Sequence, residues 1–303
     1  MEREEFLRKM ELIDEKLRTR NMDISHRVLE AFIEFEKDYE GVLWGPSVEV
    51  LKRLHKPFEG VNLFEEIKKW YSLRYGEKFN MQTDVGEIPV FIRGEIFMIK
   101  IPLIYGAPQI DVLRLVDKMT NHMVQSLNKE EIFLIYRVFE LGANFFFALD
   151  WQINESAHDV EEKITIQSRQ LLNRGIEDIK TAISRIKNKP DDLQDCCFHA
   201  QQAVEKFFKG YLTAFVSIED KVLKEIGHNF KKLIKKASKT LPGILDMRDD
   251  IEKVDFPMDI RYQYLNITIE KAIESIYSCI RICYFILQAI YNIKPVLVIS
   301  YEV

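Results

Sequence analysis

Apolar residues recur at steps of three and four along most of the chain, and this spacing predicts a mainly helical protein. A first helical region is expected at residues 2–39. A second helix is expected at residues 63–75, where Gly76 ends it. A third, at residues 129–151, begins after Asn128, whose side chain is suited to cap its first turn.

Two short segments show a different pattern, rich in valine, isoleucine and phenylalanine. Residues 86–92 and 95–105 are separated by Arg93 and Gly94, which predicts a β-hairpin with a tight turn. Residues 109–127 fit either a strand or a helix, and the pattern leaves that choice open.

The second half of the chain is expected to be a helical bundle. Short breaks at Asn188-Lys189-Pro190 and Leu241-Pro242-Gly243 separate long amphipathic segments, as in an up-and-down bundle. The helices are expected at residues 158–187, 191–216, 228–240 and 266–293.

A chain of 303 residues is long enough for two domains. The predicted fold class is mainly α, with a C-terminal up-and-down helical bundle preceded by an α+β domain that contains the hairpin. The expected division is residues 1–157 for the α+β domain, 158–295 for the bundle and 296–303 for a short C-terminal strand.

Composition is that of a globular protein, with 47% hydrophobic and 30% charged residues. The net charge of −5 gives no overall basic footprint for nucleic acid, although a local basic patch is compatible with it. The four cysteines do not form a disulfide pattern and are expected to be reduced, which favours a cytoplasmic protein. The apolar segments Phe145–Leu149 and Ile280–Ile293 are expected to be too short to span a membrane.

The last predicted helix is apolar on two sides. Ile269, Ala272 and Ile276 lie on one side, and Ile273, Tyr277 and Ile280 lie on another. One side is expected to face the bundle core. The other needs a partner, and a second copy of the chain, giving a homodimer, is preferred over the N-terminal region.

Four pieces of the second half resemble, in order, the HEPN family (higher eukaryotes and prokaryotes nucleotide-binding). The most specific is Phe198–Leu212, with its Phe-His-Ala-Gln-Gln-Ala start. Around it lie Ile176–Ile186, Gly227–Phe230 and Asp259–Tyr262, so that the resemblance covers roughly residues 160–293. It implies a helical bundle that binds nucleotides or RNA and dimerises. Residues 41–157 resemble no family. The N-terminal domain as a whole is expected to supply specificity or a regulatory contact, and a protein partner is possible for it.

Many HEPN proteins resemble metal-independent RNases in which an arginine is followed, four to six residues later, by a histidine. Arginine suits the phosphate and histidine can move the proton. Arg261 stands near the arginine position, but no histidine follows it and Asn266 occupies one of the permitted places. Only Arg20 and His26 have the spacing, far from the resembling segment. A non-catalytic binding module is therefore preferred, with a degenerate RNase that uses Arg261 and an oligomerisation scaffold as alternatives.

The candidate ligand-binding residues fall in three groups. Their polar and basic side chains could contact phosphates, or they could instead form hydrogen bonds with polar groups of neighbouring helices. No cofactor and no metal site are predicted. The acidic stretch between Asp246 and Asp259 could neutralise the run of lysines between Lys221 and Lys239, or it could hold a hard cation. The candidates are His199, Gln202, Lys206 and Lys209 on one helix, His228, Lys231, Lys232 and Lys235 around the next, and Arg261.

Overall fold

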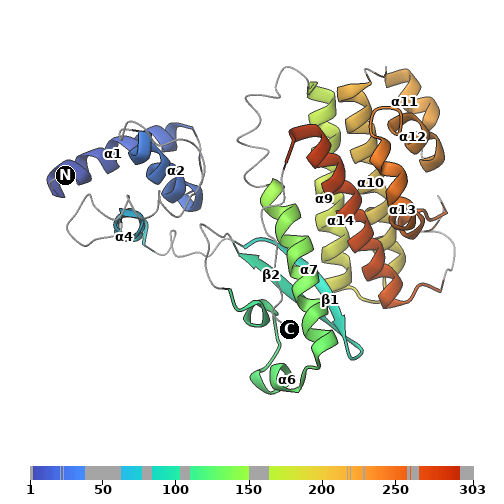
Figure 1. The fold of residues 1–303 in the computed structure, drawn as a ribbon, viewed down its shortest axis with the longest axis horizontal. Helices are drawn as coiled ribbons and strands as arrows, with labels where there is room; N and C mark the ends of the chain where they lie inside the picture. Colours follow the sequence, from blue (N-terminus) through green and yellow to red (C-terminus); the bar gives the residue numbers. More distant parts are fainter. Residues whose placement is uncertain are drawn as a thin grey trace. The chain divides into compact units, whose positions relative to one another are not determined.

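A computed structural model describes residues 3–20, 22, 24–37, 63–76, 84–102, 110–149, 164–216, 218, 220–227, 229–257, 260 and 266–293 (Figure 1). The chain divides into two compact units. The first comprises Met1–Asp84 and Pro102–Gln109, and the second comprises Val85–Ile101 and Ile110–Val303.

The first unit contains three described helices, α1 (Arg3–Thr19), α2 (Ile24–Lys37) and α4 (Leu63–Tyr75). Their apolar stripes meet in one core, where Phe35 and Tyr71 are fully buried. Gly76 ends α4 with a φ of +56°, a conformation that glycine adopts without strain, so the expected helix end is confirmed.

A buried polar cluster links these three helices. Asp14 of α1 accepts a hydrogen bond from the Tyr75 hydroxyl of α4 and forms an ion pair with Arg27 of α2 at 3.3 Å. Arg27 also donates to the Met22 carbonyl at 2.7 Å. Burial and the neighbouring Asp14 carboxylate raise the pKa of Tyr71 and of Tyr75, which keeps both phenols protonated.

The second unit begins with the expected β-hairpin, formed by β1 (Asp84–Ile92) and β2 (Glu95–Pro102). Arg93 and Gly94 in the turn both have positive φ, 51° and 87°, as a two-residue turn between twisted strands requires. The Arg93 guanidinium forms two 2.7 Å hydrogen bonds to the Glu131 carboxylate. The turn is thereby held at the start of α7.

Helix α7 (Lys129–Phe147) starts as expected at Asn128, and it does so with a complete capping box between Asn128 and Glu131. The ambiguous segment before it contains a short 3₁₀ turn, η1 (Val112–Leu115), and helix α6 (Asn121–Ser126). One isolated antiparallel bridge joins Ile99 of β2 to Val116.

The bundle that follows confirms the expected helical fold (Figure 1). Two of its helices, α11 and α13, were not expected, because segments this short carry little periodicity. A 3₁₀ turn, η3 (Pro242–Met247), precedes α13. The helices are α9 (Ile166–Asn188), α10 (Leu193–Phe215), α11 (Asp220–Ile226), α12 (Phe230–Ala237), α13 (Arg248–Val254) and α14 (Ile269–Tyr291).

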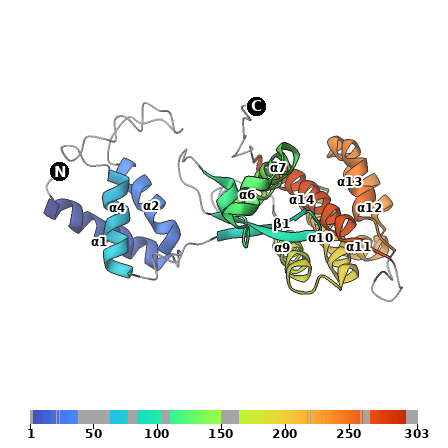
Figure 2. The same ribbon diagram turned by 90° about the horizontal axis from the view of Figure 1, so that it is seen from below.

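The hairpin packs against the bundle of the second unit. Figure 2 shows it with α6 and α7 on one side and α9 on the other. The buried Tyr277 hydroxyl of α14 donates to the Pro89 carbonyl of β1 at 2.6 Å, and Lys187 of α9 pairs with Glu87 at 2.7 Å. The compact units separate Met1–Asp84 and Pro102–Gln109 from the rest of the chain, and the domain boundary at 157 and 158 stays a prediction. The expected strand at residues 296–303 lies outside the described residues.

The second apolar side of α14 is covered within the chain. Helix α14 packs against α10 and α13 and also against α7, and Tyr277 reaches the hairpin. This finding removes the argument that a second copy is needed to cover that side. Among the described helices α14, Ile269–Tyr291, is long and apolar enough to cross a membrane, and it is longer than the expected apolar segment Ile280–Ile293. Burial of most of the helix explains its apolarity as that of a core helix.

Candidate nucleic-acid interface

Two of the four candidates on α10, His199 and Lys206, contact a residue of the neighbouring helix α9. The His199 Nδ1 atom lies 3.0 Å from the Asp178 carboxylate of α9, and Lys206 forms an ion pair with the same carboxylate. On its other side, His199 Nε2 lies 3.8 Å from Asp195, which Arg185 of α9 approaches at 2.7 Å. The structure thus joins His199 and Lys206 into one network of charges between two helices.

Lys209 is also paired, with Glu205 one turn earlier on α10 at 2.6 Å. Glu205 is buried, and its neighbour Gln201 donates to the Phe256 carbonyl at 2.7 Å. Gln202, the fourth candidate on this helix, is half-buried. Of the two interpretations given to the α10 candidates, these contacts favour the one in which they hold helices together.

Replacing Asp178 by alanine is expected to destabilise the bundle by about 1–3 kcal/mol, because His199 and Lys206 would lose their common acceptor. All three side chains are no more than 25% exposed, so water compensates only in part. Thermal or urea unfolding followed by circular dichroism measures this loss. Glu177→Ala is the matched control, since its ion pair with Lys180 is exposed and should contribute less than about 0.5 kcal/mol. Equal stability of the two variants would contradict the proposed role of Asp178.

Helix α12 presents a different arrangement, with its apolar residues buried and its lysines outward. Phe230, Leu233 and Ala237 are buried, and Asn229 caps the helix by accepting a hydrogen bond from the Lys232 amide at 3.0 Å. The remaining face, called here the α12 lysine face, consists of Lys231, Lys232, Lys235, Lys236 and, in the following turn, Lys239. All of these are exposed except Lys236, which is half-buried.

None of the five lysines forms a side-chain ion pair or hydrogen bond within the described part of the chain. Lys231 lies near one described carboxylate, Asp255, whose pKa is raised by burial, an effect that the Lys231 ammonium partly opposes. This contrasts with Lys187, Lys206 and Lys209, which are all paired. The α12 lysine face therefore offers uncompensated positive charge to solvent.

The acidic stretch that follows α12 is mostly engaged elsewhere. Asp250 pairs with Arg281 of α14 at 2.7 Å and accepts a hydrogen bond from Ser278 at 2.8 Å. Glu252 pairs with Arg248 at 3.0 Å within α13. Of the described acidic residues in this stretch, Asp255 lies near the lysine run, beside Lys231, and Asp259 lies outside the described residues. No group of three or more His, Cys, Asp or Glu side chains in the described ranges is arranged to hold a metal ion.

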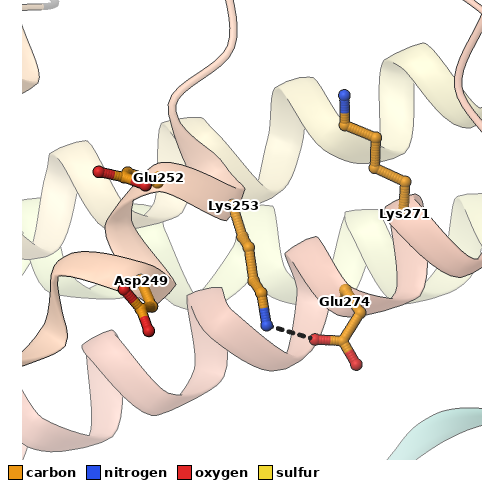
Figure 3. A pocket seen from close by; sticks show the side chains of 5 residues that line it. All are labelled: Asp249, Glu252, Lys253, Lys271 and Glu274. Carbon is orange, nitrogen blue, oxygen red and sulfur yellow. Dashed lines mark hydrogen bonds and ion pairs between the residues drawn. The ribbon is translucent and has the colours of Figure 1, made fainter.

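Two shallow depressions lie on the second unit. One, of about 370 Å³, is formed by α13 and α14 (Figure 3), and the Lys253–Glu274 ion pair at 3.0 Å crosses it. Its other lining residues are Asp249, Glu252 and Lys271, so charges of both signs alternate around it. The second, of about 480 Å³, lies along the C-terminal part of α9 and is lined by Lys180, Thr181, Ser184, Arg185, Asn188 and Lys189.

Comparison with known families decides the nature of the bundle. The family model of the HEPN domain matches residues 168–290, from the first turn of α9 to the end of α14. Residues 168–290 are a HEPN domain. No curated protein and no solved structure matches the chain.

The HEPN domain contains all of the candidate binding residues named from the sequence. His228 and Arg261 lie outside the described residues. The contacts of Arg261, which stands near the arginine position of the RNase motif, are therefore not described. Asn266, at one position permitted for the RNase histidine, is exposed just before α14. Arg20 belongs to the first unit, outside the HEPN domain.

Sequence reasoning missed the partners of the candidates rather than the candidates themselves. Asp178 lies 21 residues before His199 and 28 before Lys206, and no local pattern connects residues so far apart. Lys236 and Lys239 complete the α12 lysine face, and both belong to the basic run between Lys221 and Lys239 that the sequence shows.

Proposed function

We propose that the HEPN domain is a non-catalytic module that binds nucleotides or RNA through their phosphates at the α12 lysine face. The observation that supports this proposal is that five neighbouring lysines have no side-chain partner among the described residues, whereas the basic candidates on α10 are neutralised by Asp178 and Glu205. Unpaired surface cations attract phosphates and release their counterions on binding.

The arrangement favours contacts to phosphate over recognition of bases. Lysine is a flexible point charge, and it lacks the planar fork with which arginine grips an oxyanion in two places. The proposal therefore includes no chemistry at α12. It assigns α10 a structural role in the domain.

Removing three charges tests this proposal. Lys231→Gln, Lys232→Gln and Lys235→Gln combined should weaken binding of a labelled single-stranded RNA by about 100-fold at 0.1 M salt, since each lost phosphate contact costs roughly fivefold there. Fluorescence anisotropy measures the affinity, and a gel of the same samples, without metal, detects cleavage. The variant should fold normally because all three side chains are exposed.

A matched control removes three positive charges elsewhere on the second unit, by Lys100→Gln, Lys129→Gln and Arg137→Gln, which are also exposed. Its affinity should stay within about threefold of the unaltered protein, because only the overall charge changes. Equal weakening by both triple variants would contradict a site at α12. RNA cleavage that Arg261→Ala abolishes would replace the proposal with the RNase alternative.

Homodimer formation is a separate proposal, supported by the resemblance to dimerising HEPN proteins and no longer by an uncovered side of α14. Light scattering coupled to gel filtration should give twice the chain mass of 35.9 kDa. A mass of one chain at high concentration would contradict it. If no nucleotide or RNA binds, the oligomerisation scaffold becomes the better account.

A further inference from the structure

The lysines of the α12 lysine face lie in a row on a convex helical surface. Lys231 and Lys232 belong to one turn, Lys235 and Lys236 to the next, and successive turns rise about 5.4 Å. Lys239 extends the row into the turn after the helix. The charges are therefore spread along a line and do not converge on one point.

A mononucleotide is normally held in a concave site that buries most of its surface and orders the base. Neither depression described above includes a lysine of α12, since one is lined by α13 and α14 and the other by α9. Within the described part of the chain, neither of these two depressions therefore gives a single nucleotide a concave site at the α12 lysine face.

The same face offers no side chain on which a base could stack. The one aromatic residue of α12, Phe230, is 3% exposed and packs inward with Leu233. Stacking on aromatic side chains supplies much of the affinity for individual bases in single-stranded nucleic acid. Without it, contacts at α12 are confined to the sugar-phosphate backbone, which carries no sequence information.

We infer that the ligand of the α12 lysine face is a nucleic-acid chain, bound along its backbone phosphates without selection of bases, and not a free nucleotide. This inference rests on the proposed function, which leaves nucleotide and RNA open. It follows from three features of the described residues together: charges in a row, two depressions that both lie away from these charges, and no exposed aromatic residue on α12.

Chain length is the variable that tests the inference. Anisotropy titrations would use labelled oligo(U) of about four, eight and sixteen nucleotides, with UTP and ATP as competitors at up to about 1 mM. We expect the affinity to rise about tenfold or more from the shortest strand to the longest, because more phosphates reach the lysine row. Neither mononucleotide should displace the longest strand, and oligo(A) and oligo(U) of equal length should bind within about threefold of each other.

The outcomes separate this inference from the proposal on which it rests. Displacement by a mononucleotide at micromolar concentration, or more than about a tenfold preference for one base, would overturn the inference. If the three-lysine variant lost that binding too, the proposed function would stand with a different ligand. Absence of binding to chains and mononucleotides alike would overturn both.

Discussion

Asp14→Ala should destabilise the first unit by about 3–5 kcal/mol, the largest effect expected for any single substitution considered. Asp14 is 3% exposed and is the carboxylate partner of Arg27, which is itself 8% exposed. Removing it leaves a buried guanidinium without its counter-charge and takes away the acceptor of the Tyr75 hydroxyl. Hydrogen exchange of the amides of α1, α2 and α4 measures the loss, with α9 and α10 as the internal reference.

The adjacent residue supplies the control. Glu15 is exposed and pairs with the exposed Arg18 at 2.8 Å, so Glu15→Ala should change stability by less than about 0.5 kcal/mol. Asp14→Asn keeps a side-chain acceptor but loses the charge, and its effect should lie between the two. If the amides of α1, α2 and α4 exchanged no faster in the Asp14→Ala protein than in the Glu15→Ala protein, the buried ion pair would not hold the three helices together.

Gly175→Val should destabilise the HEPN domain by about 2–3 kcal/mol. Helices α9 and α10 approach closely here, and a Cβ atom on Gly175 would lie 2.6 Å from the ring of Phe207 and 3.2 Å from the Ala203 carbonyl oxygen. Phe207 is fully buried and cannot move aside. The gain in helix propensity over glycine is smaller than this overpacking cost. Calorimetry should show a melting temperature lower by about 5–10 °C.

Asn173→Val is the matched control, because it introduces the same side chain two residues earlier on α9 at an exposed position. It should change the melting temperature by no more than about 2 °C. A Gly175→Val protein as stable as this control would mean that the close contact between α9 and α10 is absent in solution.

Local patterns predicted those parts of the fold that depend on neighbouring residues. Arg93 and Gly94 mark the hairpin turn, Asn128 caps α7, and three- and four-residue spacing places the long helices of the bundle. The division into units was not predictable in this way. It depends on contacts such as that between Pro89 and Tyr277, which are 188 residues apart.

The candidate site shows the same limit. The α12 lysine face could be predicted because amphipathicity within one helix sorts its lysines from Phe230, Leu233 and Ala237. The pairing of His199 and Lys206 could not be predicted, because their common partner, Asp178, lies on the neighbouring helix. The pair of Lys209 with Glu205 is a local one, four residues apart on α10.

The salt dependence of RNA binding tests the central claim most directly, because it counts phosphate contacts. For single strands the logarithm of the binding constant falls against the logarithm of salt concentration with a slope of about −0.7 per phosphate contacted. We expect the variant with Lys231, Lys232 and Lys235 replaced by glutamine to have a slope shallower by about 2, which corresponds to three lost contacts. The control at Lys100, Lys129 and Arg137 should keep the original slope. An unchanged slope in the α12 variant would show that RNA, where it binds, is held by other residues.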